Sequence, residues 1–376
     1  MVAAALTADG MRTGLHTSPH LLHVGERMRI DGVPADEDWL SDQLRRHQTL
    51  FQKVSPSFFE AVFALSCLYF AEKEVDLAVV EVGLGGRLDA SNILAADASV
   101  ITSIALDHTD ILGTSLGAIA REKAGIIKKG RPLVCGALDQ ESLSIIGGIA
   151  SSHEAILHEV SKQVMVTADG EGRTILRSDM NHLASVRLDL VGAHQQANSA
   201  LALRTLELIA PDITPESIRV GLENTASLSG IRGRTEIIGR DPLTMVDVAH
   251  NASAIDSSLE TFFCLRMNEG MRDSARAETA DVVLGLLADK DAPAIAAVLR
   301  KYPVRVIPVS IDAPRGLDAN SLTKVLNENG VFTVENAGSA WKALTASRKS
   351  GRDCIVLGSH HVAAETLHHS MDPSSR

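Results

Sequence analysis

The chain has 376 residues, with 36 Lys and Arg against 47 Asp and Glu, and its formal net charge at pH 7 is −11. This acidic balance, without any basic block, argues against a nucleic acid as a partner. The length and a hydrophobic fraction of 45% are typical of a protein with a large core and two domains.

The cysteines and the apolar stretches indicate the compartment. The four cysteines are widely separated and form no Cys-x-x-Cys pair, so we interpret them as reduced thiols. The longest apolar stretch, Ala61–Phe70, is too short to cross a bilayer, and the N-terminus lacks the basic flank of a signal peptide. The sequence therefore predicts a soluble, cytoplasmic protein with no membrane partner.

The first part of the chain has the pattern of alternating helices and strands. A capping box, Ser-Phe-Phe-Glu, opens a predicted helix from Ser57 to about Ala71. Apolar runs at Leu77–Val80 and Val100–Ile104 predict two buried parallel strands, with a Gly-rich turn between them. A further helix is predicted from Leu116 to Ile126.

The pattern changes after His158. Apolar and polar residues alternate from there to Val191, which indicates antiparallel hairpins, and a helix is predicted from about Gln195 to Leu208. A second series of strands and helices begins at Thr244. Its predicted strands are Met245–Asp247, Asp281–Leu286, Arg305–Val309 and Cys354–Leu357.

These elements predict an α/β protein with two domains. Strands that alternate with helices favour a parallel sheet with helices on its faces. We place the boundary near Ser229–Arg234, which gives domains at residues 1–229 and 235–376. The polar run Met267–Thr279 is predicted to be an exposed insertion in the second domain.

Polar residues follow the first two predicted parallel strands at the points where these strands end. Glu81 comes directly after Leu77–Val80, and His108 follows Val100–Ile104. Ligands bind at the carboxyl ends of strands in an open α/β sheet, and a carboxylate on a buried strand is costly unless it is paired or binds a metal. A carboxylate with an imidazole ordinarily indicates Zn²⁺ or Mn²⁺. From the residues alone, a metal-dependent hydrolase is one candidate function.

The Gly-rich turn Val82–Arg87 and the side chain of Lys123 each have more than one interpretation. The turn is not a dinucleotide loop, because its third glycine is misplaced and a poor helix start follows it. It is either a tight turn that lets the backbone approach a ligand or a plain connector. By itself, Lys123 is typical of a solvated, charged helix face.

The second domain offers its own polar groups. Asp247 and His250 stand where a predicted strand enters a helix, so both are expected to project toward a crevice. Arg234 lies in the connector between the domains, a natural position for a guanidinium that clamps phosphate.

Long, ordered motifs across the chain carry a family resemblance. They are Thr17–Leu21, Glu26–Ile30, Glu81–Asn92, Thr102–Asp110, Arg121–Ile127, Gly233–Glu236, Asp247–Asn251, Leu287–Asp291 and Gly358–His360. Together they resemble the folylpolyglutamate synthase/dihydrofolate synthase branch of the Mur ligase superfamily. The resemblance runs from about residue 1 to about residue 365.

The resemblance implies a fold and a reaction. The fold is a parallel-sheet, P-loop-type ATPase domain followed by a Rossmann-like C-terminal α/β domain, in a monomer. The reaction is ATP-dependent amide ligation. A carboxylate of a folate, and also of dihydropteroate, attacks the γ-phosphate of ATP, and the amine of L-glutamate then displaces phosphate from the acyl phosphate. Mg²⁺ and fixed cations neutralise the transferring phosphoryl group.

The resemblance also implies metal ligands. Ser18, Glu81 and His108 would hold one Mg²⁺, which replaces the softer-metal interpretation above. Lys123 would match the family's carbamylated lysine, a catalytic residue whose carbamate holds a second Mg²⁺.

By the same resemblance, other residues would bind the nucleotide. Gln196 and Asn198 fall where the family meets adenine. The residues that would reach phosphates and ribose are Arg234, Asp247 and His250, and of these Arg234 and His250 would also be catalytic.

Two residues would bind the folate or pteroate substrate. Asp89 lies where bifunctional members bind the pterin, which favours dihydrofolate synthase activity as well, and Ser359 would contact substrate from the second domain.

One departure from the family concerns the start of the chain. Family members begin with a buried strand and a phosphate loop of the type Gly-Thr-Asn-Gly-Lys-Gly-Ser, whereas Met1–Leu6 resembles the helix that follows that loop. We expect this chain to be inactive or severely impaired, and two strands to lack a partner. A lesser departure is Ala252, where the family usually has proline.

The sequence therefore leaves three candidate functions. The first is a folate–glutamate ligase whose start is misassigned or truncated, and the second is a non-catalytic relative that keeps folate or nucleotide binding. The intact run Asp247–Asn251 argues against the third, the metal-dependent hydrolase, which would not need it.

Overall fold

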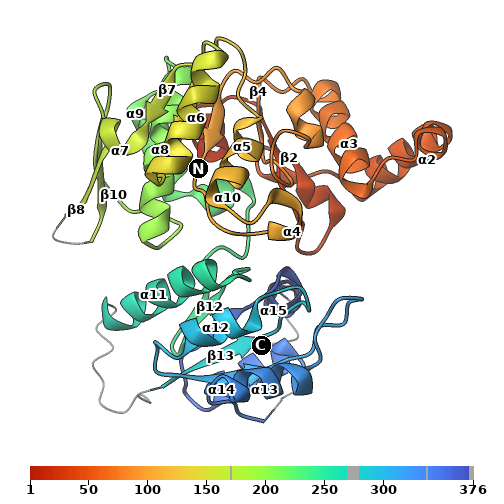
Figure 1. Cartoon of the computed structure of the whole chain (residues 1–376), viewed down its shortest axis with the longest axis vertical. Helices are drawn as coiled ribbons and strands as arrows, with labels where there is room; N and C mark the ends of the chain where they lie inside the picture. The colour runs from red at the N-terminus through yellow and green to blue at the C-terminus, as the bar shows by residue number, and fades with distance from the viewer. Residues whose placement is uncertain (170–171, 269–278, 336–337, 372–376) are drawn as a thin grey trace. The chain divides into compact units, whose positions relative to one another are not determined.

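The computed structural model describes residues 1–169, 172–268, 279–335 and 338–371, and the chain divides into two compact units. Unit 1 comprises Met1–Asp189 and His194–Ile231, and unit 2 comprises Leu190–Ala193 and Arg232–Arg376. Each unit has its own sheets and its own covering helices (Figure 1).

Two parallel strands form the centre of the first sheet of unit 1. They are β1 (Thr13–His16) and β4 (Leu77–Val80), and their register runs from Thr13 opposite Leu77 to His16 opposite Val80. The antiparallel strands β2 (Met28–Ile30) and β3 (Val33–Pro34) extend this sheet in the order β3-β2-β1-β4. Because β1 and β4 run in the same direction, the segments that follow them leave the sheet at the same edge.

A second sheet of unit 1 is entirely parallel. It contains β5 (Ser99–Ile101), β6 (Leu133–Cys135) and β7 (Leu157–Glu159) in that order. β4 pairs only with β1 and β5 only with β6, so each is the outer strand of its sheet among the described residues. β5 ends at Ile101 rather than at the predicted Ile104, and residues 102–107 have no regular structure.

The prediction that β4 is a buried strand is wrong. Ala78 is exposed, and the other three side chains of the strand are only half-buried. An outer strand has no neighbour on its second side, so an apolar sequence alone does not ensure burial.

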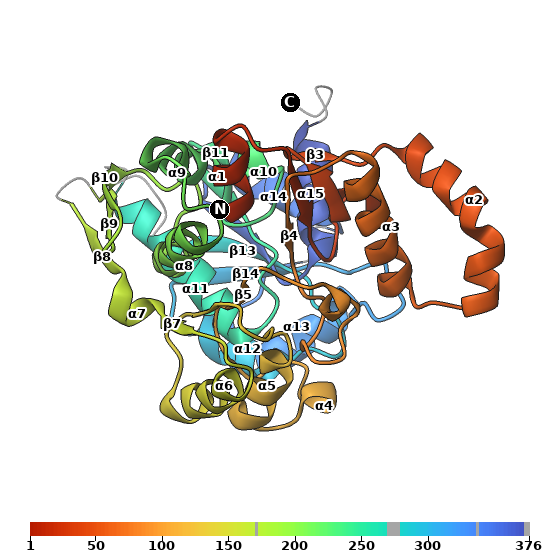
Figure 2. The same cartoon turned by 90° about the horizontal axis from the view of Figure 1, so that it is seen from above.

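The helix predicted at the capping box is confirmed as α3 (Phe58–Glu72). The Ser57 hydroxyl accepts the Glu60 N–H at 3.2 Å, and the Glu60 carboxylate accepts the Ser57 N–H at 2.7 Å. The preceding helix α2 (Glu37–Val54) lies on the outer side of α3 (Figure 2). Trp39 joins the two helices, because its ring lies 4.7 Å from that of Tyr69.

Other helices complete unit 1. They are α1 (Val2–Ala8), η1 (Val24–Arg27), η2 (Ala90–Ile93), α4 (Thr109–Leu112), α5 (Leu116–Ala124), α6 (Gln140–Ser152), α7 (Val160–Gln163), α8 (Ala193–Ile209), α9 (Pro215–Glu223) and α10 (Thr225–Ser229). The helices predicted from Leu116 and from Gln195 are thus confirmed, as α5 and α8. α1 packs closely on α9, where a Cβ added to Gly221 would lie 2.4 Å from the Cα of Ala5.

The predicted antiparallel hairpins are also confirmed. β8 (Met165–Ala168), β9 (Thr174–Arg177) and β10 (His182–Val186) form a three-stranded antiparallel sheet. Leu176 of this sheet packs into one core with side chains from α8 and α9, including Leu203 and Ile218. This sheet therefore belongs to the same hydrophobic unit as the parallel strands.

Unit 2 contains one five-stranded sheet in the order β11-β12-β15-β13-β14. Its strands are β11 (Glu236–Arg240), β12 (Leu243–Val246), β13 (Ala280–Leu284), β14 (Val304–Pro308) and β15 (Cys354–Leu357). All pairs are parallel except β11 with β12, and the core side chains include Leu243, Phe262 and Val282. Its helices are α11 (Ala252–Asn268), α12 (Ala292–Leu299), α13 (Ala319–Glu328), α14 (Ala340–Lys349) and α15 (His360–Met371).

The predicted α/β class with parallel sheets is therefore confirmed in both units. Residues 269–278 of the predicted insertion lie outside the described residues. Within the described ranges, no helix is both long enough and apolar enough to cross a membrane.

Candidate active site

Ser18 and Glu81 meet at the carboxyl ends of β1 and β4. The Glu81 N–H continues the strand pairing by donating to the His16 carbonyl at 2.9 Å, and the Ser18 N–H donates to the Glu81 carboxylate at 2.7 Å. The Ser18–Pro19 peptide is cis. Glu81 is exposed, so the predicted cost of a buried carboxylate does not apply, and this carboxylate can receive a ligand from solvent.

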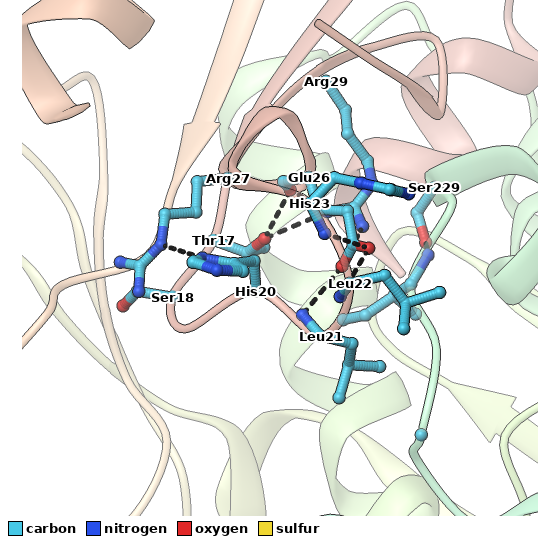
Figure 3. Close-up of polar contacts among 12 residues, drawn as sticks. Thr17, Ser18, His20, Leu21, Leu22, His23, Glu26, Arg27, Arg29 and Ser229 are labelled. Carbon is cyan, nitrogen blue, oxygen red and sulfur yellow. Dashed lines mark hydrogen bonds and ion pairs between the residues drawn. The ribbon is translucent and has the colours of Figure 1, made fainter. Parts of the chain in front are cut away.

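The loop that carries Ser18 is held by the carboxylate of Glu26 (Figure 3). This carboxylate accepts the backbone N–H groups of Leu21, Leu22 and His23 at 2.9, 3.0 and 3.2 Å. Burial alone would raise the pKa of Glu26, but these hydrogen bonds outweigh it and the pKa is lowered. The Arg29 side chain donates to the Thr17 hydroxyl at 3.1 Å and fixes the beginning of the loop.

Arg27 and His20 form a second contact within the loop (Figure 3). The Nε of Arg27 donates to the Nδ1 of His20 at 2.8 Å, and the guanidinium lies over the ring of Phe58 at 5.2 Å. Burial lowers the pKa of His20, and the positive charge of Arg27 lowers it further. Burial also lowers the pKa of Arg27, with the charge of Glu81 opposing this, so Arg27 and Glu81 share one electrostatic environment.

Lys123 lies close enough to Asp107 for their charges to interact. Burial lowers the pKa of Lys123, and the charge of Asp107 opposes this, so Lys123 is not the solvated charge that the residue pattern alone indicates. His108 has a left-handed backbone conformation with φ 49°, and its Nε2 lies 3.9 Å from Asp107 Oδ1. Asp107 thus interacts both with Lys123 and with His108, after the segment that follows β5.

The donor chemistry at Ser18 and Glu81 fits a hard divalent cation. A carboxylate and a hydroxyl are oxygen ligands of the kind that Mg²⁺ accepts while keeping water and substrate phosphate as its other ligands. Among the described residues, no group of three or more His, Cys, Asp or Glu side chains is placed to hold a metal.

The Gly-rich turn packs closely against α5, so its glycines do not all face open space where a ligand could bind. A Cβ on Gly86 would lie 2.7 Å from the carbonyl oxygen of Glu122, and a Cβ on Gly125 would lie 2.4 Å from the Cα of Arg87. Arg87 also binds the Glu122 carboxylate through Nε and Nη2 at 3.1 and 3.0 Å. The turn is therefore a structural tie that positions the helix of Lys123.

Asp89 caps the segment after this turn. Its carboxylate accepts the N–H groups of Leu84 and Ser91 at 3.0 and 2.9 Å. A Cβ on Gly83 would meet the Phe59 ring at 2.5 Å and the Asp89 carboxylate at 3.1 Å, so an aromatic ring and a carboxylate both lie against Gly83. Such a pair suits a flat heterocycle with N–H groups.

His16 supports the Phe59 ring from the core. Its only distinguishing feature in the sequence is its place beside the Thr-Ser-Pro-His motif. It is fully buried, its Nδ1 lies 2.8 Å from the Ser66 hydroxyl, and its ring meets those of Phe59 and Phe63 edge-on at 5.8 and 5.3 Å. Burial, followed by the charge of Arg27, lowers the pKa of His16 to about 4.

Gln196 and Asn198 lie in the first two turns of α8. Residues two apart on a helix point in different directions, so the two side chains do not face one common surface. The Asn198 amide donates to the Gln195 side chain at 3.1 Å.

In unit 2, Asp247 and Ser359 follow the adjacent parallel strands β12 and β15. Asp247 is almost buried, and its carboxylate accepts the N–H groups of Thr235 and Ala249 at 2.6 and 2.8 Å. The Ser359 hydroxyl accepts the Val362 N–H at 3.2 Å, as a helix cap. Both side chains therefore have structural roles that the sequence did not predict.

His250 and Arg234 lie on the same unit. The Nδ1 of His250 donates to the Val248 carbonyl at 3.0 Å, which leaves Nε2 as the acceptor of the neutral ring. The His250 ring lies 5.9 Å from that of His360. Arg234 is half-buried, and within the described part of the chain its guanidinium has no hydrogen bond or ion pair.

Comparison with known proteins identifies related chains. Residues 38–206 match the family model of the Mur ligase middle domain. The chain is 30% identical over 370 residues to the dihydrofolate synthase/folylpolyglutamate synthase of Escherichia coli (strain K12), covering 96% of this chain and 81% of the relative.

Two solved structures share the fold. The E. coli FolC in complex with DHPP and ADP has a TM-score of 0.83 at 29% identity, covering 98% of this chain and 84% of that chain. The bifunctional folylpolyglutamate synthase/dihydrofolate synthase from Yersinia pestis c092, complexed with AMPPNP and Mn ion, has the same TM-score, identity and coverage.

Proposed function

The chain belongs to the folylpolyglutamate synthase/dihydrofolate synthase family of ATP-dependent ligases, and from this premise we propose that it joins L-glutamate to a folate and also to dihydropteroate. ATP and a divalent metal ion are characteristic of the family. In the proposed reaction an oxygen of the acceptor carboxylate attacks the γ-phosphorus of ATP, and ADP leaves. The glutamate amine then attacks the acyl carbon, loses a proton and expels phosphate.

The observation that carries the proposal is the joining of Ser18 and Glu81 at the ends of two adjacent parallel strands. Ser18, Glu81 and His108 would hold one Mg²⁺, which supplies charge neutralisation for the phosphoryl group. Arg27 lies close enough to Glu81 for their charges to interact, so a cation also stands beside this carboxylate.

Lys123 is the proposed site of carbamylation. A lysine must lose its proton before its nitrogen can attack carbon dioxide, and burial lowers the pKa of Lys123. The resulting carbamate would convert a cation into a ligand for a second Mg²⁺.

The remaining roles are proposed residue by residue. Gln196 and Asn198 would bind adenine. Their side chains point in different directions from α8, so only one of them can face the same group of the base. Asp89 would bind the heterocycle of the acceptor, and Ser359 would contact substrate. Arg234 would bind phosphate, which its unpaired guanidinium among the described residues supports.

Asp247 and His250 would complete the nucleotide site of unit 2. The Nε2 of His250 is an acceptor in the neutral ring and can bind a hydroxyl or take up a proton. Each carboxylate oxygen of Asp247 accepts a hydrogen bond from a backbone N–H group. Asp247 would therefore hold the end of the strand in place as well as bind ribose.

Domain roles, oligomeric state and location are also proposals. Residues 1–229 would form the ATPase domain and residues 235–376 the C-terminal domain of the ligase, in a monomer. All four cysteines are free, which supports a cytoplasmic location.

The test separates binding from turnover. Isothermal titration of the purified 376-residue chain should detect dihydropteroate or tetrahydrofolate, and lack of binding by both would overturn the proposal. ADP release that requires both L-glutamate and acceptor would demonstrate ligation.

A second candidate is a non-catalytic relative that binds folate or nucleotide. It predicts binding of the acceptor with no ADP release even at high Mg²⁺ and ATP.

A further inference from the structure

The loop Thr17–Arg27 presents side chains from a fixed backbone. Three consecutive N–H groups, those of Leu21, Leu22 and His23, converge on the Glu26 carboxylate, and Arg29 holds the loop at Thr17 (Figure 3). A loop restrained in this way loses little further freedom when a ligand binds. His20 lies within this restrained segment.

The contact with Arg27 determines which nitrogen of His20 carries the proton. The Nε of an arginine carries a hydrogen and cannot accept a hydrogen bond. Since Arg27 Nε lies 2.8 Å from His20 Nδ1, the Nδ1 atom must be the acceptor and must be unprotonated. The neutral ring therefore has its hydrogen on Nε2. This assignment follows from geometry, because the opposite tautomer would place two N–H groups against each other.

The Nε2–H of His20 belongs to the loop that follows β1. His20 is half-buried, and no hydrogen bond of its Nε2 exists within the described ranges of the chain. It follows Ser18 by two residues, and Ser18 is bonded to Glu81 at 2.7 Å. Arg27 also interacts electrostatically with Glu81. An N–H donor of defined tautomer thus stands in the loop that carries Ser18, the proposed metal ligand.

We propose that His20 donates its Nε2–H to an oxygen of the acceptor carboxylate, and that Arg27 is a positioning residue that holds His20 in the required tautomer. The inference rests on the proposed function and names the group of the substrate that the loop recognises. Negative charge develops on the acyl oxygen when the glutamate amine attacks, and a donor already oriented toward it stabilises that charge without reorganisation. The tautomer is held by the protein before substrate arrives.

Two conservative variants separate the donor from the loop contact. In His20→Asn the amide oxygen can replace Nδ1 as the acceptor for Arg27, but no group replaces Nε2–H. In His20→Gln the longer amide can place an N–H near the Nε2 position. We expect His20→Asn to bind dihydropteroate about 10-fold more weakly than the wild type, and His20→Gln to stay within about 3-fold.

A matched control comes from the same loop. His23→Asn alters a histidine whose side chain is 63% exposed and pairs with Glu37. It should bind dihydropteroate as the wild type does. Circular dichroism and the unfolding midpoint of each variant show whether the fold is kept. If His20→Asn does not fold, the inference is tested by comparing His20→Gln with the wild type and by the tautomer measurement below.

The tautomer can be measured without any ligand. In the ¹⁵N spectrum of histidine-labelled full chain, the resonances lost in His20→Gln identify the His20 ring, which should carry its hydrogen on Nε2. Arg27→Met removes the donor to Nδ1 and should introduce the Nδ1–H form. A merely structural role of Arg27 would not change the tautomer.

Two results would overturn the inference: a wild-type ring with hydrogen on Nδ1, or a folded His20→Asn with unchanged dihydropteroate affinity. The proposed function fails separately, when the wild-type chain binds neither dihydropteroate nor tetrahydrofolate. In that case the role of His20 in acceptor binding is overturned as well, whatever tautomer the ligand-free spectrum shows.

Discussion

The Ser18 N–H donates to the Glu81 carboxylate at 2.7 Å, across 63 positions of sequence. The two residues meet because β1 and β4 are parallel neighbours and the chain leaves both strands at the same edge. This contact helps to orient the exposed carboxylate of Glu81. It joins the proposed metal site to the loop that carries His20.

Glu81→Gln should weaken metal binding with little effect on stability. The neutral amide keeps an oxygen that can accept the Ser18 N–H but loses the charge that attracts the cation. We expect Mn²⁺ affinity in the presence of ADP, measured by electron paramagnetic resonance, to fall about 10-fold or more. Glu74→Gln, an exposed change at the opposite end of β4, is the control, and equal Mn²⁺ affinities for the two variants would contradict the site.

Lys123 should carry a carbamate when the chain is equilibrated with ¹³C-bicarbonate. Its lowered pKa increases the fraction of neutral amine at a given pH. A ¹³C carbamate resonance should appear in the wild type, grow as the pH is raised and vanish in Lys123→Arg. Lys129→Arg, at an exposed lysine paired with Glu154, should leave the resonance unchanged. A signal that survives in Lys123→Arg would assign the carbamate to another amine.

Gly125→Ala should destabilise unit 1. The added Cβ would lie 2.4 Å from the Cα of Arg87, and neither backbone can move without separating the Gly-rich turn from α5. We expect a loss of about 1–3 kcal/mol in the free energy of unfolding in urea. Gly148→Ala, inside α6 with no atom within 4 Å of the new Cβ, should instead raise stability by about 0.5–1 kcal/mol. Equal effects of the two changes would refute the packing argument.

His16 should make stability fall in acid. Its pKa is lowered in the folded chain from 6.5 to about 4, so below pH 6.5 the unfolded chain binds a proton that the folded chain does not. This contribution is complete above pH 6.5 and is lost as the pH falls from 6.5 to 4. It amounts to at most about 3 kcal/mol.

The measurement for His16 is the difference between two pH profiles. Urea unfolding of the wild type and of His16→Asn, which keeps an acceptor near Nδ1 but does not titrate, removes the contributions of all other groups. A difference between the two profiles that is constant from pH 7 to pH 4.5 would show that His16 titrates normally in the folded chain.

Much of the secondary structure follows from local sequence. The Ser57–Glu60 capping box and the alternation between His158 and Val191 both predict elements that exist, because caps and hairpins depend on neighbours along the chain. The predicted burial of β4 was wrong and β5 proved shorter than predicted. Burial of a strand depends on what lies beside it in the sheet, which the strand's own residues do not specify.

Part of the candidate site was also within reach of the sequence. Glu81 and Ser18 were identified through their motifs and lie together as expected. Arg27 and His20 stood in two of the same motifs, but no role was assigned to either, because the contact that gives them one is made across a loop. His16 had no distinguishing pattern, since a lone histidine at a strand end is most often a core residue.

The sequence by itself determined the family, the α/β class and the positions along the chain where polar groups follow strands. These depend on residue order and on periodicity, which the sequence contains. Only the tertiary structure decided the partners: Ser18 with Glu81, Arg27 with His20, and the glycines of the turn with α5. A hydrogen bond requires two atoms to approach within about 3 Å, and that distance depends on the packing of the strands and loops.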